Sequence, residues 1–150
     1  MKMTPELKKA MGNMGPGIIT AEGFLGSDKR TLSTIIDDDA QLMRRLNIDP
    51  PVLAAKMRHF MDEGRKGLGE PVTVDGDWIV KTDEARGYLA CPWEDGIFRK
   101  VNVTIELKAT GETLFYTDLL VHMVEEHGFF EGHGSSFRLD LTAAKRVLKI

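Results

Sequence analysis

Apolar residues recur at helical spacing through the first half of the chain. Ser27 or Asp28 can cap a helix that runs to about Leu46, because the apolar positions between them fall every three or four residues. Asp49 and Pro50 then predict the cap and the first turn of a second amphipathic helix. Two such helices joined by so short a link predict an αα-hairpin.

From Pro71 onwards the hydrophobic period changes from helical spacing to alternation. Apolar and polar residues alternate on both sides of Asp75-Gly76, a pair that favours a tight turn because both residues tolerate positive φ. The segment that ends at Pro92 predicts a further strand. A second alternating pair of segments flanks residues 109–111 and predicts a second hairpin.

The last third of the chain returns to helical spacing over residues 118–127, where Gly128 is a typical C-cap. The sequence FRLDL predicts a short strand, and Thr142 predicts the cap of a final helix over 142–149. We therefore expect an α+β fold in which an N-terminal helical hairpin packs on a mainly antiparallel sheet of two hairpins, followed by helix, strand and helix. Residues 1–150 are expected to form one domain, mainly helical over 1–69 and mainly β-hairpins over 70–150.

Composition agrees with a soluble globular protein, since 42% of the residues are hydrophobic, 29% are charged and the net charge is -3. The sequence shows neither an export signal nor an apolar run long enough for a bilayer, so we expect a cytoplasmic protein without a membrane partner. Cys91 is the only cysteine, which excludes an intramolecular disulfide and a four-cysteine zinc site.

Three of the four histidines fall within twelve residues, from His122 to His133. Cys91 lies near a turn before a hairpin and the histidines follow that hairpin, which is the order of parts in a zinc finger of the two-cysteine, two-histidine kind. The candidate ligands for zinc or another transition metal are Cys91, His122, His127 and His133. Only Glu94 and Asp95 lie close enough to Cys91 to replace the missing second cysteine.

Two observations count against a metal. The segment between Cys91 and His122 is longer than in a zinc finger, and helical residues five apart are rotated by about 140°, so His122 and His127 face one ion only if the helix unwinds before His127. Without a metal, His122 belongs to a polar helix face and His127 is a last-turn cation favoured by the helix dipole. Both interpretations stay open.

The glycine-rich loop after the histidine helix supplies the other candidate contacts. Phe129 and Phe130 either seal the helix end against the core or, together with Ser135, line a pocket for a small-molecule or protein partner. Cys91 paired with a histidine would suit a cysteine-dependent enzyme, and the metal group a metal-dependent one. No motif supplies a nucleophile with its base, so we assign no catalytic residue. We therefore favour a binding protein over an enzyme.

A nucleic-acid function is the remaining alternative, because two helices followed by a hairpin also describe a winged helix. The basic residues in this region are Arg44, Arg45, Lys56, Arg58, Arg65 and Lys66. The second helix nevertheless opens with PPVLAA, which offers methyl groups rather than donors to base edges. We therefore favour a small cytosolic binding module with a metal-binding Cys/His corner, ahead of a nucleic-acid-binding regulator or an enzyme.

Overall fold

The computed structural model describes residues 1–150 and contains five helices and one four-stranded antiparallel sheet. The helices are α1 (Pro5–Asn13), α2 (Leu32–Arg45), α3 (Pro50–Arg65), α4 (Asp118–His127) and α5 (Leu141–Leu148). The strands are β1 (Val72–Val74), β2 (Trp78–Ala90), β3 (Ile97–Leu107) and β4 (Thr113–Thr117). This architecture confirms the predicted α+β class.

The sheet is a meander in which each strand pairs with the next one along the chain. The predicted turn at Asp75 and Gly76 is confirmed, and both residues have positive φ, of 51° and 79°. The second predicted hairpin, around residues 109–111, joins β3 to β4. Both turns were readable from the sequence because their signals are local.

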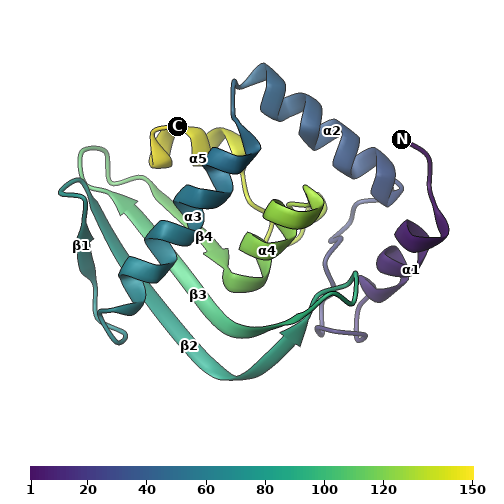
Figure 1. Cartoon of the computed structure of the whole chain (residues 1–150), viewed down its shortest axis with the longest axis horizontal. Coiled ribbons are helices and arrows are strands. Elements are labelled where there is room, and N and C mark those ends of the chain that lie inside the picture. The colour runs from purple at the N-terminus through teal and green to yellow at the C-terminus, as the bar shows by residue number, and fades with distance from the viewer.

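The strand predicted before Pro92 is not a separate element. It is the second half of β2, which runs for thirteen residues and changes register with β3 between Ala85 and Tyr88. Gly87 lies in this bulge with φ of 96°, a conformation that suits glycine. The β2–β3 ribbon therefore continues past the bulge, curves, and carries the loop Cys91–Gly96 at its far end (Figure 1).

Helices α3, α4 and α5 cover the buried face of the sheet, where they enclose the core (Figure 1). Two buried hydrogen bonds fasten the layers. Tyr116 donates its hydroxyl proton to the Met57 carbonyl of α3 at 2.6 Å, and the Trp78 indole N–H donates to the Val147 carbonyl of α5 at 2.7 Å. These bonds satisfy the polar ends of two large aromatic side chains within the apolar layer.

Helices α2 and α3 are joined by a short link but diverge from it, α3 lying over the sheet and α2 extending toward α1 (Figure 1). The expected cap of α2 at Ser27 or Asp28 is wrong, because the Thr31 side chain accepts from the Thr34 N–H and caps the helix. Asp28 instead accepts from the backbone and the guanidinium of Arg30. The preceding segment is an ordered loop.

The strand predicted from the sequence FRLDL does not form, because residues 137–140 belong to no strand and α5 begins at Leu141. Arg138 turns inward and donates two hydrogen bonds to the buried carboxylate of Asp39. Asp140 rather than Thr142 caps α5 by accepting from the N–H groups of Thr142 and Ala143.

No helix combines the length and the apolar character that a bilayer crossing demands.

Gly64 marks the closest approach of α3 to the sheet. A Cβ atom at this position would lie 2.5 Å from the Val80 Cγ1 atom and 3.0 Å from the Thr82 Cγ2 atom. We expect Gly64→Ala to lower the free energy of unfolding by about 1–2 kcal/mol, because overpacking outweighs the gain in helix propensity. Urea denaturation measures this change, and Gly12→Ala in α1, where a Cβ meets no atom within 4 Å, is the matched control.

Candidate metal centre

A tight loop places Cys91 and Asp95 side by side at the end of the β2–β3 ribbon. The Cys91 N–H donates to the Gly96 carbonyl at 2.9 Å, and the Glu94 N–H donates to the Cys91 carbonyl at 2.8 Å. Helix α1 braces the loop, since the Asn13 side chain donates to the Pro92 carbonyl at 2.8 Å. The two candidate ligands are therefore held by backbone hydrogen bonds rather than by a flexible segment.

Helix α4 presents His122 and His127 to this loop. The Nε2 atom of His122 lies 3.0 Å from one carboxylate oxygen of Asp95, and the Nε2 atom of His127 lies 2.8 Å from the other. The helix remains regular through His127 and ends at Gly128 in the left-handed conformation. The condition that the helix must unwind is wrong, because the imidazole side chains are long enough to converge from positions five residues apart.

Four donor atoms thus gather in one place, from Cys91, Asp95, His122 and His127, all within 4.8 Å of one another. Tetrahedral zinc with bonds of about 2.0–2.3 Å separates its donor atoms by about 3.3–3.8 Å, so a contraction of about 1 Å brings the group to that size. The spacing C-x3-D and H-x4-H also lies within the range of structural zinc sites, with Asp95 in place of a second cysteine. This group could hold a metal ion.

Aromatic rings fix the orientation of both histidines. The indole of Trp93 stacks on the His127 ring with a centroid separation of 4.0 Å and an interplanar angle of 4°, and Phe98 packs on His122 at 4.3 Å. The Trp93 ring in turn contacts the edge of Phe129. This packing limits the ring rotations of the two imidazoles, which predisposes them to bind one ion.

The group is shielded from solvent on most sides. Cys91 is fully buried, and the side chains of His122 and His127 are only 13% and 15% exposed. Asp95 is the most accessible member, with a side chain that is 37% exposed. A site enclosed in this way, with four protein donors, resembles a structural metal site more than a catalytic one, which keeps a position open.

Burial and the neighbouring Asp95 carboxylate raise the pKa of the Cys91 thiol to about 12, although nearby backbone N–H groups of Trp93 and Asp95 oppose this rise. Partial burial acts to raise the pKa of Asp95, but contacts with Cys91 and the two histidines hold it well below its usual range. Burial also lowers the pKa of His127 against the opposing effect of Asp95. Asp95 is therefore ionised and His127 neutral at pH 7, whereas Cys91 must lose a proton to bind a metal.

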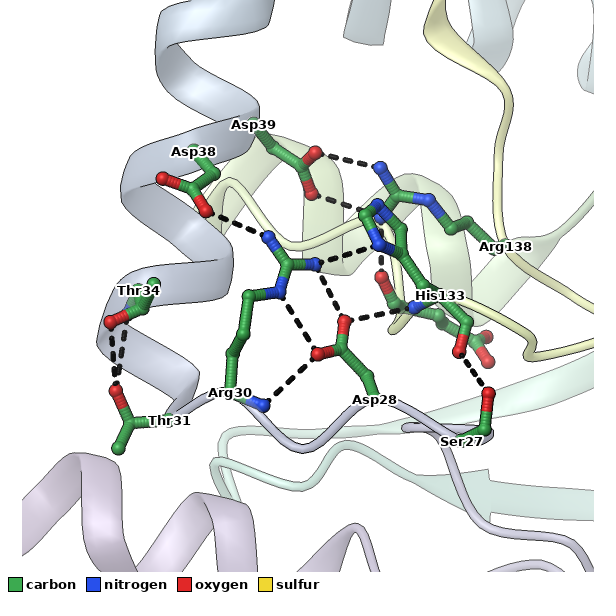
Figure 2. Close-up of polar contacts among 10 residues, drawn as sticks. Ser27, Asp28, Arg30, Thr31, Thr34, Asp38, Asp39, His133 and Arg138 are labelled. Carbon is green, nitrogen blue, oxygen red and sulfur yellow. Dashed lines mark hydrogen bonds and ion pairs between the residues drawn. The ribbon is translucent and has the colours of Figure 1, made fainter.

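The fourth candidate ligand from the sequence, His133, lies elsewhere. Figure 2 shows it among Asp28, Arg30 and Arg138, in the loop that faces α2. Its Nδ1 atom lies 3.3 Å from the Arg30 guanidinium, and its backbone N–H donates to Asp28 at 3.0 Å. The structure thus brings Cys91, His122 and His127 together with Asp95 and does not bring His133 to them.

The three residues that the sequence suggested for ligand binding lie in two places, two in the hydrophobic core and one in a loop. Phe129 and Phe130 are fully buried members of the hydrophobic core, where they seal the end of α4. Ser135 donates its hydroxyl proton to the carboxylate of Glu131 at 2.7 Å. Neither phenylalanine offers a surface to a ligand, and Glu131 was not identified from the sequence because a single glutamate in a polar loop carries no pattern.

Three of the six basic residues that suggested a nucleic-acid surface are paired with acids. Arg58 contacts Glu125, Arg65 contacts Glu84, and Lys66 contacts Glu63. The second helix, α3, buries its apolar face against the sheet and α4. These pairings reduce the positive charge that could meet a phosphate backbone.

Comparisons with protein-family models, with curated proteins and with solved structures find no significant match to this chain.

Proposed function

We propose that the protein is a zinc-binding domain whose ion is held by Cys91, Asp95, His122 and His127. The convergence of these four donors from two separate elements is the observation that carries the proposal. The ion would join the loop at the end of the β2–β3 ribbon to helix α4. Its role would be to fix this corner of the fold rather than to activate a substrate.

Ligand chemistry supports zinc over other metals. One thiolate, two imidazoles and one carboxylate form a borderline-soft set suited to a tetrahedral ion, whereas magnesium and calcium prefer oxygen donors. Cobalt and nickel share these ligand preferences and bind such sites in the laboratory. Zinc is the expected resident because it takes four-coordinate sites without demanding a square-planar or octahedral arrangement.

Asp95 acts as the anchor of the proposed site before a metal arrives. Its two carboxylate oxygens contact the two histidines, so they keep the imidazole rings converged. Metal binding replaces these contacts with bonds to the ion and displaces the Cys91 thiol proton. The protein is therefore largely preorganised, and uptake of an ion requires small side-chain rotations and not refolding.

We expect untagged protein to contain about one zinc per chain and, after exchange, to give the visible spectrum of tetrahedral cobalt with a thiolate-to-metal charge-transfer band. Elemental analysis and cobalt titration measure these two properties. Cys91→Ser should abolish the charge-transfer band, because the thiolate is its source. His127→Gln should weaken cobalt binding, because it removes one of the imidazole donors.

His59→Gln is the matched control. His59 also contacts an aspartate, Asp75, at 2.8 Å, but this pair lies on the surface away from the four donors. The variant should take up zinc and cobalt as the wild type does. Substoichiometric metal in the wild type after loading, or a cobalt spectrum that survives Cys91→Ser unchanged, would overturn the proposal.

A further inference from the structure

A cavity of about 520 Å³ is separate from the metal group, since none of its lining residues is one of the four donors. The loop 19–24, the free end of the β2–β3 ribbon, the start of α4 and the side chain of Phe137 form its walls. Half of the lining residues are hydrophobic. The volume falls within the range of pockets that bind small organic molecules.

Glu131 supplies an acidic group to this cavity. The residue is only 4% exposed, and its Oε1 atom accepts a hydrogen bond from Ser135 at 2.7 Å. The Oε2 atom accepts no hydrogen bond from the protein and is not fully enclosed by it. Glu131 is one of the residues that line the cavity. Its backbone φ of 72° is unusual for a residue other than glycine, which is a feature common at binding sites.

The edge of β3 offers backbone groups beside this carboxyl. Strand β4 pairs with β3 only from Asn102 to Glu106, so residues 97–101 of β3 have no neighbouring strand on that side. No backbone hydrogen bond joins this edge to the loop 19–24. Such an edge can accept an added strand, and Arg99, Lys100 and Val101 belong to the cavity wall.

Two cations complete the site. Arg99 and Lys100 line the cavity, and neither forms an ion pair with an acidic side chain, although the Arg99 guanidinium lies 5.8 Å from the centroid of the Tyr88 ring. Glu22 is the other charged residue of the wall, and its carboxylate accepts a hydrogen bond from Ser136. The wall therefore combines a buried acid, an unpaired strand edge and two cations without an ion pair around an apolar surface.

We propose that this cavity binds a short apolar peptide with a free amino terminus. The terminal ammonium group donates to the Oε2 atom of Glu131, and the peptide backbone lies along the free edge of β3. The carboxylate meets Arg99 or Lys100, whose side chains leave the strand on opposite faces. The apolar side chains contact residues such as Leu89 and Phe137. This ligand offers one partner to the Glu131 carboxyl, one to the unpaired edge of β3 and one to a cation of the wall.

Burial supports the assignment of an ammonium partner for Glu131. Removal from water raises the pKa of the Glu131 carboxyl to about 7, against the opposing hydrogen bond from Ser135. A buried carboxylate without a cation is costly, and an ammonium group in contact with it recovers part of that cost. Arg138 does not serve this purpose, because it contacts the Glu131 carbonyl and pairs with Asp39.

Calorimetric titration with trileucine and with N-acetyl-trileucine tests the proposal. Trileucine should bind, and acetylation should weaken binding by about tenfold or more, the loss expected for one charge-assisted hydrogen bond. In Glu131→Gln the two peptides should bind with similar, weak affinity. Glu70→Gln, which alters an exposed acid before β1, is the matched control and should bind as the wild type does.

The experiment is run on zinc-loaded and on chelated protein, so that its outcome is independent of the metal proposal. Equal affinity of the two peptides for the wild type, full retention of trileucine binding in Glu131→Gln, or no binding at millimolar peptide would each overturn the inference. Binding by chelated protein that depends on Glu131 would support it even if the protein took up no zinc.

Discussion

Chelation of zinc should lower the free energy of unfolding by about 4 kcal/mol. This value compares the chelated protein with protein at a free zinc concentration roughly a thousand times the dissociation constant. The proposed ion would bind the folded chain, in which Cys91, Asp95, His122 and His127 lie together, and not the unfolded chain, in which they are far apart. Urea denaturation with and without a chelator measures the difference.

The chelated protein should still fold, because Cys91 is the only proposed ligand among the residues of the hydrophobic core. Thirty-four buried hydrophobic residues form one contiguous cluster, and the hydrogen bonds of Asp95 with both histidines hold the corner together without a metal. Loss of zinc should therefore loosen the loop 91–96 first. Amide hydrogen exchange should increase in this loop and at the end of α4, while the centre of the sheet remains protected.

Two variants separate the ion's effect from that of the side chains. In Cys91→Ser the chelator should change the denaturation midpoint little, because the weakened site holds no zinc. In His59→Gln the chelator should have the same effect as in the wild type. A wild-type midpoint that is unaffected by chelation of fully loaded protein would contradict a structural role for the metal.

Local signals in the sequence predicted most of the fold. The turn at Asp75 and Gly76 and the helix that ends at Gly128 depend on the preferences of adjacent residues, and the structure confirms both. The strand predicted around Phe137 failed because a distant partner decides its conformation. The buried pair between Arg138 and Asp39 holds this segment in a loop, and no pattern near Arg138 reveals that contact.

The sequence predicted only part of the candidate site, because the contacts between distant segments leave no local signal. The order of Cys91, His122 and His127 along the chain indicated a metal group, and the sequence left Glu94 and Asp95 as alternative substitutes for the missing cysteine. The structure places Asp95, and not Glu94, with the other donors. The role of His133 could not be read from spacing, since its contacts with Asp28 and Arg30 depend on how two distant loops pack (Figure 2). The rotation between helical positions also led to the wrong expectation that His127 could join His122 only if the helix unwound. This rotation describes the backbone and does not include the length of the side chains.

Glu131→Gln should make the protein more stable at pH 8, by about 3 kcal/mol. The pKa of the Glu131 carboxyl is raised from 4.5 to about 7 in the folded protein, chiefly by burial, and one pKa unit corresponds to about 1.4 kcal/mol. The folded state therefore holds the proton more tightly than the unfolded state. Glutamine keeps the shape of the side chain and can still accept a hydrogen bond from Ser135, but it cannot ionise.

The pH dependence follows from the direction of this shift. Between about pH 4.5 and pH 7 the folded chain binds more protons than the unfolded chain, so the contribution of Glu131 to stability is full below this window and is lost as the pH rises through it. The stability of Glu131→Gln lacks this decline, so the two proteins should diverge between pH 5 and pH 8. Urea denaturation across this range measures the divergence, with Glu70→Gln as a control that should follow the wild type. A constant difference between wild type and Glu131→Gln at all these pH values would show that the carboxyl does not titrate in the cavity.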